Sequence, residues 1–229
     1  MKKLALIDID KTIYNGYTIF DLAEKQFADK ILSKECIHKL FSDLDNYKNQ
    51  AISYESFVKM LNDHWLEGLK GKSYSKIWDY ADQYFKSHQF KFFSFVSELF
   101  QVLADTHDCY LITGEMQFVA EPIAKLLNTK GFRATTLAVK EDLITGQVLN
   151  YLASRAEKKI AIIELVDQYD KAGSIALGDS AGDIEMLAAV EQAFCINAAP
   201  ELREVGLQKG WSFVNENSIL ESVYRYLGI

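Results

Sequence analysis

Two pairs of aspartates carry the clearest chemistry in this 229-residue sequence. Asp8 and Asp10 come directly after one short apolar run, and Asp179 and Asp183 come after another. Taken singly, each pair also fits an acidic turn or a helix cap. Carboxylates this close repel each other unless a cation or a shared proton relieves them. If both pairs meet at one edge of a sheet, they predict a hard-cation site, and an oxygen-only ligand set favours Mg²⁺.

A third position suits an anion. Thr113 and Gly114 end another apolar run, and they offer a hydroxyl and flexible backbone N–H groups to a phosphate. A simple turn explains these two residues equally well when they are taken alone. The next residue, Glu115, is expected to point to solvent.

Two adjacent lysines, Lys158 and Lys159, open a predicted helix. A cation is mildly unfavourable at a helix start, which indicates either a functional reason or a solvated basic pair. Between the two we predict Lys159 as the phosphate ligand. Ile162, Ile163 and Val166 follow it at three, four and seven residues and would turn it towards the sheet with them.

Short apolar runs alternate with helical patterns along most of the chain, which predicts an α/β fold with a mainly parallel sheet. In such a sheet, ligands bind beyond the carboxyl ends of the strands, where the aspartates and Thr113 fall. A turn is expected at Asp142–Gly146. The predicted strands are Leu4–Ile9, Cys109–Thr113, Ala134–Val139, Ile175–Leu177, Ala193–Ile196 and Ser212–Val214, and the helices between them include Phe118–Leu127, Lys159–Gln168 and Ile184–Val190.

Residues 13–90 differ from the rest, because they hold no clear strand, no proline and many aromatic residues at helical spacing. We therefore predict a core of residues 1–12 and 91–229, with a helical cap of residues 13–90 inserted after the first strand. Packing within the cap accounts for most of the aromatics, and a pocket for an apolar or cationic leaving group is the alternative. These residues are Tyr47, Tyr54, Phe57, Trp65, Tyr74, Trp78, Tyr80 and Tyr84.

The net charge of −7 argues against nucleic acid as a partner, since neutralising its phosphates takes clustered cations. A small phosphorylated metabolite needs only a few cations and a metal ion. The first apolar run is too short for a signal peptide, and no run approaches the roughly 20 residues of a membrane span. The three cysteines lack metal-ligand spacing. Cys109 and Cys195 lie in apolar runs and are expected to be buried, reduced thiols. We predict a cytoplasmic protein with no membrane partner.

In chain order, Asp-x-Asp-x-Thr, Thr-Gly, Lys and Gly-Asp-x-x-x-Asp resemble the four motifs of the haloacid dehalogenase superfamily. The resemblance is carried by the segments LALIDIDKTI, CYLITGEMQFVAEPIAKLL, EDLITGQV and IALGDSAGDIEML. It covers nearly the whole chain outside residues 13–90, and it points to the branch that includes phosphoserine phosphatases. It implies a doubly wound, mainly parallel, Rossmann-like sheet with a smaller all-helical cap domain.

This resemblance implies a Mg²⁺-dependent phosphomonoester hydrolase that forms an aspartyl-phosphate on Asp8. Asp10 would protonate the leaving oxygen and then take a proton from the attacking water. The metal would be held by the Asp8 side chain, the Asp10 backbone carbonyl and Asp179, with Asp183 and Thr12 in support. The groups implied to hold the phosphoryl oxygens are Thr113, the Gly114 amide and Lys159.

The cap departs from the phosphoserine phosphatase pattern, in which an arginine and an acidic residue are expected to hold the substrate carboxylate. The chain has no arginine before Arg133, and a lysine such as Lys48 or Lys59 does not reproduce a bidentate fork. Phosphoserine is therefore disfavoured as the substrate. The alternatives are a phosphotransferase that uses the same aspartyl-phosphate and a phosphate-binding regulatory protein with a degenerate site.

Overall fold

The computed structural model describes residues 2–229 and contains a seven-stranded sheet in the order β4-β3-β2-β1-β5-β6-β7. All neighbouring strands pair in parallel except β3 and β4. The α/β fold with a mainly parallel sheet is therefore confirmed. The strands are β1 Lys3–Ile7, β2 His107–Met116, β3 Gly131–Lys140, β4 Leu143–Asn150, β5 Ile175–Gly178, β6 Gln192–Ile196 and β7 Ser212–Val214.

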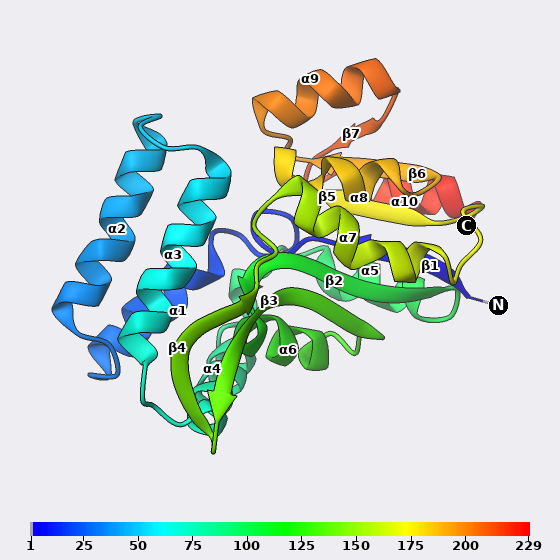
Figure 1. Cartoon of the computed structure of the whole chain (residues 1–229). Coiled ribbons are helices and arrows are strands. Elements are labelled where there is room, and N and C mark those ends of the chain that lie inside the picture. The colour runs from blue at the N-terminus through cyan, green and yellow to red at the C-terminus, as the bar shows by residue number, and fades with distance from the viewer. Residues whose placement is uncertain (1) are drawn as a thin grey trace.

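Helices cover both faces of this sheet (Figure 1). The alternation along β1 shows the two layers: Ala5 and Ile7 belong to the core that contains α5, α6 and α10, whereas Leu4 and Leu6 belong to the core beneath α7, α8 and α9. A strand buried on both faces reads as an unbroken apolar run. The helices are α1 Thr18–Ala28, α2 Lys34–Lys48, α3 Tyr54–Leu69, α4 Tyr74–Ser87, α5 Val96–Ala104, α6 Gln117–Leu126, α7 Arg155–Val166, α8 Ile184–Ala188, α9 Pro200–Lys209 and α10 Ile219–Leu227, with short 3₁₀ turns at Gln89–Lys91 and Ala181–Asp183.

Strand β1 lies at the centre of the sheet, between β2 and β5. The chain builds outwards from β1 to β4 on one side and then crosses to β5 to build the other side. This reversal of direction makes the carboxyl ends of β1, β2 and β5 a topological switch point, where open α/β sheets bind their ligands. The predicted aspartates follow β1 and β5, and Thr113 lies in β2 beyond its last pair with β1.

The antiparallel pair β3–β4 corrects one predicted boundary. The turn is only Glu141–Asp142, whose φ values of 53° and 65° are left-handed, as a two-residue hairpin turn needs. The predicted turn over Asp142–Gly146 is therefore too long, because β4 begins at Leu143 and includes Gly146.

Residues 13–90 form α1 to α4 and the 3₁₀ turn. Helices α2 and α3 lie side by side at one end of the molecule, while α4 packs against α6 (Figure 1). The link between α3 and α4 is hydrogen-bonded to the hairpin: the Gly71 N–H donates to the Ile144 carbonyl at 2.8 Å, and the Tyr74 N–H donates to the Asp142 carbonyl at 2.6 Å. The division into core and cap remains a prediction.

Among residues 2–229, no helix combines the length and the apolar character needed to cross a lipid bilayer. All three cysteines in this part of the chain are buried and free, as predicted for Cys109 and Cys195. Cys109 lies in β2 and Cys195 in β6.

Candidate active site

The centre of the site is a buried ion network built on Lys158. Its ammonium donates to Asp8 Oδ1 at 2.9 Å and to Asp183 Oδ1 at 2.7 Å. These side chains come from α7, the end of β1 and the 3₁₀ turn after β5. The Lys158 side chain is only 4% exposed, and such a buried cation is stable only with close anionic partners.

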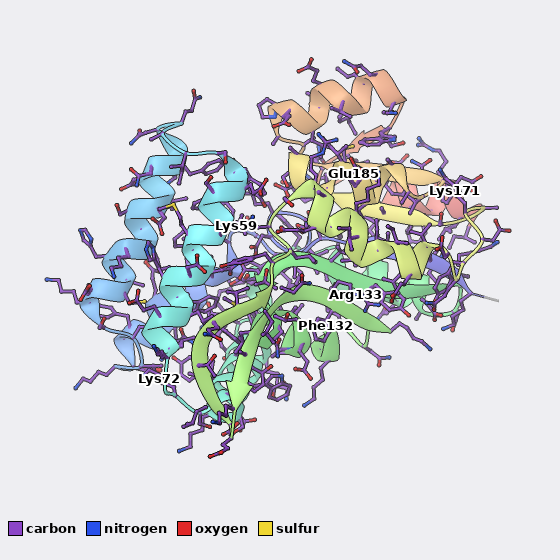
Figure 2. The ribbon with its side chains drawn as sticks, viewed as in Figure 1. Lys59, Lys72, Phe132, Arg133, Lys171 and Glu185 are labelled. Carbon is purple, nitrogen blue, oxygen red and sulfur yellow. The ribbon has the colours of Figure 1, made fainter. Side chains whose placement is uncertain are left out.

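The prediction of Lys159 as the inward-facing lysine is wrong. Its side chain is 62% exposed and pairs at 3.3 Å with Glu185 of α8, which is labelled in Figure 2. The helix face that packs on the sheet runs through Lys158, Ile162 and Leu165, at i, i+4 and i+7, whereas Ile163 is exposed.

The predicted start of this helix is also wrong. Ser154 caps α7, and its side chain and that of Glu157 form a capping box. The helix therefore begins at Arg155, four residues before the predicted start. The Ser-x-x-Glu signal was present in the sequence.

Asp183 is held in place rather than free to bind a ligand. Its Oδ2 accepts hydrogen bonds from the backbone N–H groups of Asp179 and Ser180 at 3.1 and 3.0 Å. Its Oδ1 accepts a hydrogen bond from the Lys158 ammonium. The absence of a side chain at Gly178 makes room for it, because a Cβ there would lie 2.5 Å from the Asp183 Cβ.

Carboxylate oxygens of Asp8, Asp179 and Asp183 lie within 4.8 Å of one another. Within residues 2–229, no donor is hydrogen-bonded to the Asp179 carboxylate, which is buried. Since Asp183 is already satisfied, Asp8 and Asp179 are the side chains left to face a cation. An oxygen donor set with few protein ligands fits Mg²⁺.

The loop after β1 shapes the rest of this edge. Thr12 donates to Asp8 Oδ2 at 3.3 Å, and the Thr18 backbone N–H donates to Asp10 Oδ1 at 2.8 Å. Lys11 between them has a φ of 57°, in the left-handed region that few residues other than glycine adopt. This turn sends the Asp8 and Asp10 side chains into the same cavity.

The end of β2 completes the floor of the cavity with Thr113 and Gly114. The Gly114 carbonyl accepts hydrogen bonds from Asn62 of α3 at 3.1 Å and from Thr135 of β3 at 2.8 Å. A Cβ on Gly114 would approach Val58 of α3 to 3.2 Å. The glycine thus lets α3 close over the end of the strand.

Glu115 is not in solvent, contrary to the prediction. It is 8% exposed and lines the cavity beside Asp10. Burial and the charge of Asp10 raise the pKa of Glu115 well above its ordinary value. Its Oε2 has no hydrogen-bond partner among the described residues. Sequence spacing gave no signal for this residue, because an acid after a turn is usually solvated.

Burial raises the pKa values of three carboxyl groups in the cavity, those of Asp8, Asp10 and Asp179. Burial, and next the charge of Asp183, raise the pKa of Asp8 to about 7, against a smaller opposing effect of Lys158. Burial also raises the pKa of Asp10 and that of Asp179. A bound cation would favour the ionised forms, so the site as built is complementary to positive charge.

Helix α3 closes the cavity from above. Lys59 of α3, labelled in Figure 2, pairs with Glu157 of α7 at 3.6 Å, and Tyr151 donates a hydrogen bond to Asp63. Together with Asn62, these contacts join one face of α3 to the core beside the site. On the side opposite the strands, the cavity is lined by residues of α1 to α3 and of the loop before α1. These are Tyr17, Ile19, Tyr47, Tyr54, Phe57, Val58, Leu61 and Asn62.

A family model for haloacid dehalogenase-like hydrolases matches residues 5–188. The chain belongs to this family. The match runs from β1 through α8 and includes every residue of the site from Asp8 to Asp183. The family predicted from four ordered motifs is thereby confirmed.

Two curated relatives are similar over part of the chain. One is the phosphoserine phosphatase SerB2 of Mycobacterium tuberculosis, 31% identical over 99 residues, which are 42% of this chain and 24% of that protein. The other is the "Inhibition of morphological differentiation protein" of Streptomyces azureus, 33% identical over 111 residues, or 47% of this chain and 40% of that protein. The matches thus span less than half the length of either relative.

Solved structures share the fold over almost the whole chain. A protein of unknown function from Bordetella pertussis has a TM-score of 0.79 at 19% identity, covering 94% of this chain and 99% of that one. A substrate-bound phosphoserine phosphatase has a TM-score of 0.70 at 18% identity, covering 97% and 98%. At such identities, the likeness speaks for the fold alone.

Proposed function

We propose that this protein is a Mg²⁺-dependent phosphomonoester hydrolase that acts on a small phosphorylated metabolite through an aspartyl-phosphate on Asp8. The observation that carries this proposal is the buried contact of Asp8 with Lys158 at 2.9 Å, beside Asp10, Asp179 and Thr113 in one cavity. A carboxylate, a cation and a second carboxyl group at one point are what covalent phosphoryl transfer needs.

In the first half-reaction, a carboxylate oxygen of Asp8 attacks phosphorus, and the bond between phosphorus and the ester oxygen breaks. Asp10 gives its proton to the departing alkoxide, which leaves as the alcohol. Burial raises the pKa of Asp10, which favours the protonated form that an acid needs. Lys158, Thr113 and the Gly114 amide stabilise the charge on the phosphoryl oxygens.

In the second half-reaction, the ionised Asp10 takes a proton from a water molecule whose oxygen attacks phosphorus. The bond between phosphorus and the Asp8 oxygen breaks, which releases inorganic phosphate and regenerates both side chains. Asp183 holds Lys158 through its Oδ1, so it acts as a positioning residue.

Asp8, the Asp10 backbone carbonyl and Asp179 would hold Mg²⁺. When bound, the ion offsets the repulsion between the attacking carboxylate and the phosphate. The uncommitted Asp179 carboxylate and the burial of the cluster support this choice.

The test is hydrolysis of a panel of phosphate esters with Mg²⁺ or with EDTA, using Asp8→Asn as the control variant. We expect release of inorganic phosphate that EDTA and the substitution both abolish. Turnover that persists in Asp8→Asn would contradict the covalent mechanism. Phosphate recovered on an added alcohol or nucleoside instead of water would identify a phosphotransferase.

A further inference from the structure

The cavity above Asp8 has an aromatic wall of four rings, those of Tyr17, Tyr47, Tyr54 and Phe57. Tyr47, near the end of α2, stacks on Phe57 of α3 with centroids 4.6 Å apart and planes 9° apart. Tyr17 meets Phe57 edge-on at 6.4 Å, and Tyr54 meets Tyr47 edge-on at 5.9 Å. These are favourable ring geometries, and they give one continuous apolar surface.

Three of the aromatic residues noted in the sequence line this cavity together with Tyr17, namely Tyr47, Tyr54 and Phe57. Trp65 and Trp78 are not part of the cavity lining. Trp65 is fully buried and donates a hydrogen bond to Gln26, and Trp78 donates one to Glu121. Both rings serve helix packing.

Hydrogen bonding distinguishes two tyrosines of the wall, Tyr47 and Tyr54, from Tyr74 and Tyr80 of α4. Tyr80, for example, donates a hydrogen bond to Asp29 at 2.7 Å. Within residues 2–229, the hydroxyls of Tyr47 and Tyr54 form no hydrogen bond to another residue. Aromatic residues that only pack usually give their polar atom a protein partner, so these two hydroxyls are available to a ligand.

The charges around the cavity limit what a leaving group can carry. Of the described residues, those that α1–α3 contribute to the lining are all uncharged, with Asn62 as the only amide. Lys158 is committed to Asp8 and Asp183. The Lys11 ammonium lies 4.2 Å over the Tyr17 ring and cannot form a bidentate pair with a carboxylate. The other charged groups of the lining, those of Asp8, Asp10, Glu115 and Asp179, are carboxyls, which disfavour an anionic leaving group.

From this wall we propose that the substrate is the phosphate ester of a small alcohol with an apolar body and no anionic group of its own. The inference rests on the proposed phosphatase function. The cavity measures about 70 Å³, below the roughly 150 Å³ that takes up benzene. This small volume favours a short chain or a single ring over a larger alcohol such as a nucleoside.

The test compares kcat/KM for butyl and benzyl phosphate with that for phosphoserine, phosphoethanolamine and a nucleoside 5′-monophosphate, with acetyl phosphate as the reference substrate. We expect kcat/KM for the two apolar esters to exceed that for the charged and bulky ones by about tenfold or more. The reason is that the apolar part of each ester moves from water onto the aromatic wall. Equal turnover of all esters, or a preference for phosphoserine, phosphoethanolamine or the nucleotide, overturns the inference while leaving the phosphatase function intact. No turnover of any ester, acetyl phosphate included, overturns both.

Variants in the wall test the same point independently. Tyr47→Leu and Phe57→Leu keep apolar volume but remove the stacked pair. We expect each to lower the ratio of benzyl phosphate to acetyl phosphate turnover by about threefold to tenfold, from the usual strength of ring contacts. Tyr80→Leu, in an aromatic residue of α4 outside the cavity, is the matched control and leaves the ratio unchanged. An unchanged ratio in both wall variants contradicts the inference.

Discussion

Lys158 and Lys159 are neighbours with the same charge, yet one side chain is 4% exposed against Asp8 and the other is 62% exposed beside Glu185. On a helix, successive side chains differ in direction by about 100°. Only one of the two lysines can therefore face the sheet. A substitution of the exposed lysine is a matched control for the same substitution of the buried one.

At this residue scale, we expect Lys158→Met to lower kcat by about 10²–10³, the usual cost of removing one donor to a developing negative charge. Lys159→Met should leave kcat close to that of the wild type, because an exposed ion pair contributes little. Steady-state hydrolysis with excess Mg²⁺ measures both. Circular dichroism must accompany the assay, since removing Lys158 leaves two buried carboxylates unpaired, at a cost of about 3–5 kcal/mol. A larger loss of activity in Lys159→Met than in Lys158→Met would contradict the assignment.

At the scale of elements, strand β5 and the 3₁₀ turn after it meet at Gly178. A Cβ on this residue would lie 2.5 Å from Asp183 Cβ and 2.7 Å from its Cγ. Both Asp183 atoms are rigidly held, because the carboxylate of this residue accepts hydrogen bonds from two backbone N–H groups. The position therefore excludes every side chain.

We expect Gly178→Ala to lower the free energy of unfolding by about 1–3 kcal/mol, as overpacking does, and to lower kcat by moving Asp183 away from Lys158. Urea unfolding and phosphate release measure the two effects. Gly206→Ala is a matched control: its Cβ would meet the Phe213 ring at 2.8 Å, outside the cavity lining, so it should cost stability and spare kcat. Full activity in Gly178→Ala would contradict the positioning role of Asp183.

At the scale of the whole molecule, the acidic cluster links stability to pH and to metal. Burial and Asp183 raise the pKa of Asp8 to about 7, and burial raises that of Asp179 well above its ordinary value. Between about pH 4 and 7, the folded metal-free protein thus binds more protons than the unfolded chain. Its stability falls as the pH rises through this window. Mg²⁺ needs the ionised carboxylates and reverses this loss.

We therefore expect Mg²⁺ to raise Tm at pH 8 and to have little effect at pH 5. At about 100 times its Kd, the ion adds about 2.7 kcal/mol, or about 5–10 °C for a chain of this size. Thermal melts at both pH values measure it, with Asp179→Asn as the variant that should lose the shift. An equal shift in Asp179→Asn would place the ion elsewhere.

Local pattern determined the family and most of the fold. Unbroken apolar runs specify strands buried on both faces, and acids at their carboxyl ends must meet once the sheet is parallel. Asp8, Asp10, Thr113 and Asp179 could therefore be predicted to share one site, as the cavity shows. Even the start of α7 was encoded locally, in the capping box of Ser154 and Glu157.

Tertiary structure alone decided which neighbours point inwards. Lys158 rather than Lys159 reaches Asp8, and Glu115 turns into the cavity instead of solvent. Phe57 lines the cavity while Trp65 packs against Phe118. The physical reason is that periodicity gives the direction of a side chain relative to its own helix or strand. Packing between segments that lie far apart in the sequence decides which of these side chains are covered by a neighbour and which face solvent.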